Sequence, residues 1–150
     1  AEANIWNDPH AAAAVLGADW PVTLVGLDVT RQVTCTAEDF AGLARAAPVT
    51  GGFLDRAVQF YLGFSRERHD LDGCHMHDPT AVIEITDPAL FETRAAPLAV
   101  TLEGEAAGRT RFAPAGPAVS VCVDVDAAEV RARFLEVTGK ADACRDAATG

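Results

Sequence analysis

The chain has 150 residues, enough for one domain with a buried core. Hydrophobic residues make up 49% of the sequence and charged residues 23%, which is typical of a globular protein and argues against a disordered one. The formal net charge is −10, so we expect no nucleic acid polymer as partner, because an acidic surface cannot replace the counterions of a polyphosphate backbone. No apolar run reaches the length of a membrane span, and we expect no membrane partner.

The cysteines indicate the cellular compartment, and the first residues indicate whether the chain is a fragment. Four cysteines occur, and none belongs to a C-x-x-C pair. Because no secretory leader is visible, we expect free thiols in a reducing cytoplasm. The chain opens with AEANIWNDP, without a methionine, and these residues resemble the middle of a longer sequence. We therefore expect the chain to be a fragment.

The first polar cluster lies in EANIWNDP. If this segment is extended, residues two apart share a side, so Glu2 and Asn4 would point the same way. A carboxylate beside an amide can bind neighbouring hydroxyl groups, as on a sugar. The alternative is an exposed, polar strand end without a ligand.

A helix and a strand are expected next. In NDPHAAAAVLGA, Asn7 or Asp8 can cap a helix whose first position suits Pro9, and Gly17 is expected to end it. The apolar run from Val22 to Val29 shows no alternation, which predicts a strand buried on both faces. Asp28 would lie near the carboxyl end of that strand, where open α/β sheets bind ligands, or would be a polar turn residue.

The middle of the chain predicts two further helices. Thr36 and Asp39 resemble a capping box before an alanine-rich helix. Gly51 and Gly52 are expected to break the chain, and FLDRAVQFYLGF after them has apolar residues at helical spacing. The charged segment SRERHDLDG that follows is expected to be a mobile loop.

The segment DGCHMHDPTAV gathers two histidines, a cysteine and two aspartates. In one interpretation, Asp78 caps a helix that begins at Pro79 and the histidines lie in a polar loop. In the other, His77 and Asp78 bring an acid–base group and a hard oxygen ligand to a helix N-terminus. Zinc bound by Cys74, His75 and His77 is a third possibility, but it lacks a second ligand pair at the usual spacing. A carboxylate favours calcium or magnesium.

After residue 86 the pattern changes to short strands. APLAVTLEG, RTRFAP and AVSVCVDVD predict strands separated by glycine and proline turns, and AAEVRARFLEVTGK predicts a closing amphipathic helix. The order of elements predicts an α/β fold with a smaller antiparallel element toward the C-terminus, without a linker that would divide it into two domains.

Taken together, EANIWNDP, PVTLVGLDVT, DGCHMHDPTAV and LEG resemble the C-terminal half of the inosine–uridine-preferring nucleoside hydrolases, from Glu2 to about Val137. The resemblance implies an open, Rossmann-like sheet flanked by helices. Residues 1–150 would be the C-terminal part of a single domain, with the N-terminal half absent. It also implies calcium-dependent hydrolysis of the N-glycosidic bond of purine or pyrimidine ribonucleosides.

The resemblance also implies roles for single residues. Asp78 would be a calcium ligand, and His77 would lie beside the leaving base. Glu2 and Asn4 would bind the ribose of the nucleoside substrate. Tyr61 lies in the segment where family members carry mobile pocket tyrosines.

One departure from the family bears on activity. The N-terminal aspartate cluster of the family, which resembles D-T-D-x-G-x-D-D, does not occur in this sequence. We therefore expect the chain alone to be inactive, and a non-catalytic assembly or binding module is the alternative. Because half of an α/β sheet leaves apolar faces and edges uncovered, we also expect a homo-oligomer or a longer polypeptide.

Overall fold

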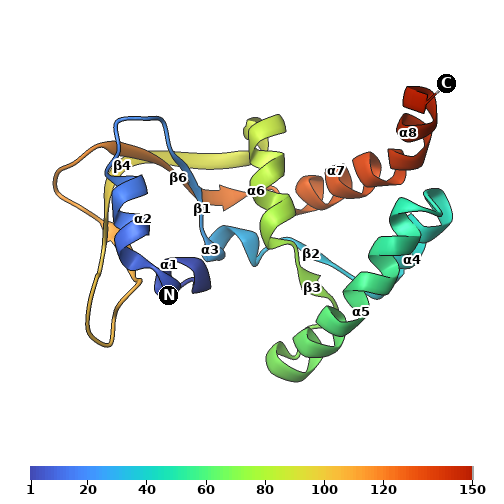
Figure 1. Ribbon diagram of the computed structural model, residues 1–150, viewed down its shortest axis with the longest axis horizontal. Coiled ribbons are helices and arrows are strands. Elements are labelled where there is room, and N and C mark those ends of the chain that lie inside the picture. Colours follow the sequence, from blue (N-terminus) through green and yellow to red (C-terminus); the bar gives the residue numbers. More distant parts are fainter. Residues whose placement is uncertain (150) are drawn as a thin grey trace. The chain divides into compact units, whose positions relative to one another are not determined.

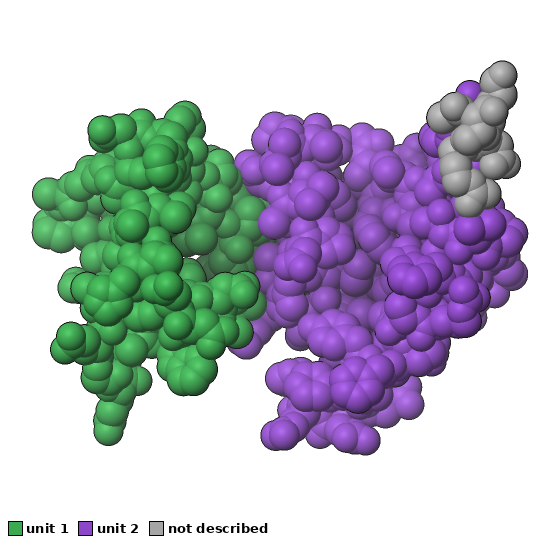
Figure 2. Space-filling view, viewed as in Figure 1, with its two compact units in different colours: residues 1–29, 91–125 green, residues 30–90, 126–150 purple. Residues whose placement is uncertain are grey.

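The computed structural model describes residues 1–149, which cluster into two compact units. Unit 1 comprises residues 1–29 and 91–125, and unit 2 comprises residues 30–90 and the chain from residue 126 onward (Figure 2). In the described part of the chain, no helix combines the length and the apolar character that crossing a membrane requires. That both units belong to one domain stays a prediction.

Unit 1 is built on a four-stranded mixed sheet (Figure 1). The sheet order is β1 (Thr23–Val25), β6 (Ala118–Val125), β4 (Phe91–Val100) and β5 (Thr110–Phe112). β1 runs parallel to β6, whereas β4 pairs antiparallel with both β6 and β5. The helices α1 (Ala3–Asn7) and α2 (Pro9–Leu16) precede the sheet, and α2 packs against β4. The expected α/β fold and its antiparallel C-terminal element are confirmed.

The strand predicted from Val22 to Val29 is wrong in length and in position. β1 has three residues and lies at the edge of the sheet, where it pairs with β6 alone. The chain turns at Gly26, whose carbonyl accepts a hydrogen bond from the Val29 amide, and continues as α3 (Leu27–Thr30). Val29 is fully buried as part of this helical turn. The apolar run therefore serves both a short strand and a buried turn.

Unit 2 is helical with one small antiparallel strand pair. β2 (Thr34–Cys35) pairs with β3 (Cys74–His75), and Thr34 lies opposite His75. The helices are α4 (Ala37–Ala46), α5 (Thr50–His69), α6 (His77–Thr86), α7 (Ala127–Gly139) and α8 (Ala141–Thr149), with a 3-10 turn at η1 (Pro88–Leu90). α4 packs along α5, and α7 contacts both α4 and α6. The core between them includes Phe40, Leu43, Ile83 and Val130.

Two expectations about α5 are wrong. Gly51 and Gly52 lie in its first turn and do not break the chain. Gly51 is buried because α4 passes so close that a Cβ atom there would collide with the Leu43 carbonyl. The segment expected as a charged loop is helical as far as His69 and ends at Asp70, which has a left-handed backbone with φ 50°.

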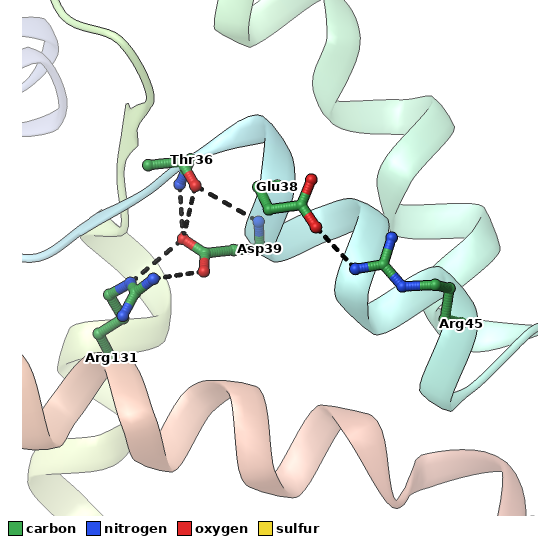
Figure 3. Close-up of polar contacts among 5 residues, drawn as sticks. All are labelled: Thr36, Glu38, Asp39, Arg45 and Arg131. Atoms are coloured by element: carbon green, nitrogen blue, oxygen red, sulfur yellow. Dashed lines mark hydrogen bonds and ion pairs between the residues drawn. The ribbon is translucent and has the colours of Figure 1, made fainter.

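The predicted capping box at α4 is confirmed and extends into an ion pair (Figure 3). The Thr36 amide donates to Asp39 Oδ2 at 2.7 Å, and the Asp39 amide donates back to the Thr36 hydroxyl at 3.3 Å. Arg131 of α7 donates through Nε to Oδ2 at 3.1 Å and through Nη2 to Oδ1. Burial by itself raises the pKa of the Asp39 carboxyl, but the bonds from Thr36 and Arg131 outweigh it and hold that pKa below its usual value.

Replacing Asp39 with alanine should lower the free energy of unfolding by about 2 kcal/mol, because it removes a cap and leaves the partly buried Arg131 without its partner. Urea unfolding of the wild-type and variant chains measures this loss. Glu38→Ala is the matched control, because its ion pair with Arg45 joins side chains that are 80% and 66% exposed. That control should change the free energy of unfolding little. Equal losses in both variants would contradict the structural role of Asp39.

Candidate active site

The N-terminus of α6 carries the polar segment that the sequence singled out. Met76 is the N-cap residue, His77 is the first helical residue, and Asp78 lies in the first turn. The interpretation in which Asp78 caps a helix beginning at Pro79 is therefore wrong, and the one that places His77 and Asp78 at a helix N-terminus agrees with the structure. The Met76 carbonyl accepts bonds from the Thr80 amide and the Thr80 hydroxyl, and no side chain caps this terminus. The Asp78 carboxylate is exposed at the positive end of the helix dipole, a favourable place for a negative charge.

A cavity of about 450 Å³ in unit 2 brings together three of the predicted site residues, Tyr61, His77 and Asp78. Its remaining walls are mostly apolar and come from α4, α5, β3, α6 and α7: Phe40, Leu54, Ala57, Val58, Cys74, His75, Met76, Pro79 and Phe134. An apolar cavity with a few polar groups at one side suits a small molecule that has both an aromatic and a polar part.

His77 is held from outside its own helix. Its Nδ1 lies 2.7 Å from the Oγ1 atom of Thr30, a residue at the end of α3 that is only 3% exposed. The ring of His75 lies 5.5 Å from that of His77, between ring centroids. Thr30 was not among the site residues predicted from the sequence, although it lies in the motif PVTLVGLDVT. No signal in a single sequence links two residues that are 47 positions apart.

His75 is a second histidine of the cavity with a different environment. Its Nδ1 atom is buried without a hydrogen-bond partner in the part of the chain that the structure describes. Burial, and then the neighbouring His77, lower the pKa of the His75 imidazole, while a backbone hydrogen bond with Arg31 acts in the opposite direction. The balance favours a neutral His75 ring, as expected for an imidazole removed from water.

The remaining groups of the cavity are weak acids. Burial, followed by the charges of Cys74 and Asp78, raises the pKa of the Tyr61 hydroxyl. Burial also raises the pKa of the Cys74 thiol, and raises that of Cys35, opposite Cys74 in the strand pair, to about 12. Both thiols are free, as expected, and stay protonated near neutral pH.

No zinc site forms from Cys74, His75 and His77. Among the side chains that the structure describes, no three of histidine, cysteine, aspartate or glutamate gather closely enough to hold a metal ion. The zinc interpretation is therefore not supported by the structure. Asp78 remains the single predicted metal ligand at this cavity.

Glu2 and Asn4 belong to unit 1. Their side chains were expected to lie together on one side of an extended chain, but they meet at the start of a helix. The segment is the helix α1 and is not extended. Glu2 is its N-cap residue: Oε1 accepts bonds from the Asn4 backbone and side-chain amides at 2.8 and 2.9 Å, and Oε2 accepts one from the Ile5 amide at 3.0 Å. The carboxylate and the amide are neighbours because of this cap.

The position of α1 within unit 1 depends on a close backbone approach at Gly108. A Cβ atom at Gly108 would lie 2.6 Å from the Cα atom of Trp6 in α1. Gly108 also has a left-handed backbone with φ 79°, which residues with side chains rarely adopt. Only glycine therefore lets the turn between β4 and β5 contact the helix that carries Asn4.

Gly108→Ala should destabilise the chain more than Gly104→Ala, which is a matched control. Gly104 has φ 78° and nothing within 4 Å of an added Cβ atom, so its replacement costs only backbone strain, about 1 kcal/mol. At Gly108 the collision with Trp6 should add roughly 1 to 3 kcal/mol. Thermal unfolding of both variants measures the difference, and an equal effect would show that α1 moves away without cost.

The fold and this cavity define a nucleoside hydrolase scaffold. The model of the family "Inosine-uridine preferring nucleoside hydrolase" matches residues 1–132, and the chain belongs to this family. The chain is 34% identical over 104 residues to the inosine-uridine preferring nucleoside hydrolase of Leishmania major, covering 69% of this chain and 33% of that protein. It is 31% identical over 134 residues to the pyrimidine-specific ribonucleoside hydrolase RihB of Escherichia coli, covering 84% of this chain and 43% of that protein.

Solved structures agree with the sequence comparison. A plant nucleoside hydrolase, PpNRh1, superposes with a TM-score of 0.87 at 30% identity and covers 93% of this chain and 47% of the plant chain. The purine-preferring ribonucleoside hydrolase from Gardnerella vaginalis superposes with a TM-score of 0.85 at 33% identity, covering 94% of this chain and 47% of that chain. The chain thus spans less than half the length of these four relatives.

Proposed function

We propose that this chain is the C-terminal half of a calcium-dependent nucleoside hydrolase that cleaves purine or pyrimidine ribonucleosides into ribose and a free base. The observation that carries the proposal is the cavity in which Tyr61, His77 and Asp78 meet at the N-terminus of α6. The family to which the chain belongs supports the reaction class. The order of the motifs from Glu2 to Val137 supports the assignment to the C-terminal half.

The roles follow from the charges that develop when the N-glycosidic bond breaks. Positive charge forms on the ribose, and electrons move to the base. His77 donates a proton or a hydrogen bond to the departing base. The Asp78 carboxylate lies on the same cavity and stabilises the positive sugar. Glu2 and Asn4 bind ribose hydroxyls, and Tyr61 contacts the substrate from α5.

The described residues do not make a complete calcium site. Calcium takes about 6 to 8 oxygen ligands, and Asp78 contributes one carboxylate to a cavity whose other walls are mostly apolar. The remaining ligands, in this proposal, come from the part of the family's length that this chain does not cover. When bound, calcium would lower the pKa of the attacking water and hold the ribose hydroxyls.

The chain alone should bind calcium weakly, because one exposed carboxylate cannot replace the hydration shell of the ion. Titration calorimetry of residues 1–150 with calcium chloride measures this affinity, with Asp78→Asn as the control for the proposed ligand. A dissociation constant below micromolar would show that this chain holds a site that the proposal does not include.

In the complete gene product, Asp78→Ala should remove activity on every nucleoside, because ribose positioning serves all substrates. His77→Ala should reduce the turnover of inosine by roughly a hundredfold or more, since the purine leaves poorly without a donor. It should affect p-nitrophenyl riboside far less, because p-nitrophenol needs no protonation to leave. Steady-state kinetics with both substrates tests this, and equal losses would contradict the role of His77.

The coding sequence upstream of Ala1 separates this proposal from a non-catalytic module. An aspartate cluster of the family's type there supports the hydrolase, and a start codon at this point supports the module. A homo-oligomer in the cytoplasm is part of the same proposal. The free thiols support the proposed cytoplasmic location. The exposed apolar side chains, such as Phe60 (85% exposed) and Ile85 (78% exposed), support the proposed oligomer, because another surface could bury them.

A further inference from the structure

The turn that follows α3 is attached to the histidine segment at several successive points. The Val33 carbonyl accepts a bond from the Met76 amide at 2.9 Å, and Thr34 pairs with His75 in the adjoining strand pair. The turn itself is closed by the bond from the Val33 amide to the Thr30 carbonyl at 3.3 Å. The backbone of both segments is therefore fixed where the side chains of Thr30 and His77 meet.

We propose that Thr30 is a positioning residue for His77: its hydroxyl donates to Nδ1 and so keeps the N–H of the neutral ring on Nε2. Nε2–H is then the hydrogen-bond donor that the departing base requires. The inference deepens the proposed function and rests on it for the catalytic consequence. The tautomer of His77 in this chain is a separate property that can be measured without any reaction.

The burial of Thr30 decides which atom of the pair is the donor. The side chain is 3% exposed, and among the described side chains its hydroxyl has one hydrogen-bond partner, Nδ1 of His77 at 2.7 Å. A buried hydroxyl proton without an acceptor costs free energy. Donation to the lone pair of Nδ1 satisfies that proton, and a neutral imidazole with a lone pair on Nδ1 carries its proton on Nε2.

The position of the contact also restricts rotation of the ring. His77 is the first residue of α6, where the backbone is fixed by the Met76 and Thr80 bonds, so only its side-chain torsions remain free. A hydrogen bond from a buried group selects one rotamer and excludes the flipped ring, which would place a carbon atom against the hydroxyl. Thr30 thus fixes both the direction of the ring and its tautomer.

The first test measures the tautomer in the chain itself, at a pH about two units above the usual histidine pKa so that the ring is neutral. Long-range proton–nitrogen correlation spectra of the nitrogen-15-labelled chain distinguish protonated from bare ring nitrogens, and His77→Gln identifies the signals of His77. We expect the proton on Nε2 in the wild-type chain. A proton on Nδ1 would overturn the proposal, and this result requires no variant of Thr30 to fold.

The second measurement uses two variants of Thr30. Thr30→Val keeps the volume and removes the hydroxyl, whereas Thr30→Ser keeps the hydroxyl. The valine variant should give a mixture of both tautomers, and the serine variant should retain the Nε2–H form. Unchanged His77 signals in a folded valine variant would also overturn the proposal, because the ring would then be held without Thr30.

The catalytic consequence is measured in the complete gene product. Thr30→Val should lower kcat on inosine roughly tenfold with little change in KM, because it weakens a bond that orients the donor and not one that binds substrate. Its kcat on p-nitrophenyl riboside should stay nearly unchanged, and Thr30→Ser should restore activity on inosine. Equal losses on both substrates would assign Thr30 a purely structural role. A wild-type gene product that hydrolyses neither substrate would refute the proposed function and leave the tautomer result to stand alone.

Discussion

The carboxylate of Asp39 is the interaction on which the arrangement of unit 2 depends. It caps α4 through Thr36 and pairs with Arg131, which lies 92 residues further along the chain in α7. Thr36 directly follows β2, and β2 pairs with β3, which leads into α6. One partly buried charge therefore joins the start of α4, directly after β2, to α7. Because the carboxylate receives several hydrogen bonds, its burial is compensated.

Local chemistry explains which elements the sequence could predict. The caps at Thr36 and at Asn7 or Asp8 could be predicted because a cap and the amides it bonds lie within three residues of each other, and the structure selects Asp8. Gly51 was wrongly predicted to break the chain. Glycine is required there because α4, which is close in space, leaves no room for a Cβ atom. The run from Val22 to Val29 was misread for a related reason. Apolar spacing indicates burial, but it does not tell whether a strand or a tight turn provides the burial.

The candidate site shows the same division between local and distant signals. His77 and Asp78 were predicted to act together because they are adjacent in the sequence. Tyr61 was added because its segment resembles a family segment. All three residues line the cavity. Their chemical roles stay predictions. Thr30 could not be found, because its partner lies on another element and no periodic pattern connects the two. The cap at α6 was misplaced by two residues because the Thr80 hydroxyl, facing back to Met76, gave no sequence signal.

The two neighbouring histidines, His75 and His77, occupy different environments. Two cationic imidazoles with centroids 5.5 Å apart would repel each other, so at most one of them can carry charge without penalty. Burial lowers the pKa of the His75 imidazole and so favours its neutral form, while its backbone pairs with Thr34 in the strand pair. The polar cluster in the sequence thus resolves into one histidine with a buried ring nitrogen and one whose ring contacts the Thr30 hydroxyl beside the cavity.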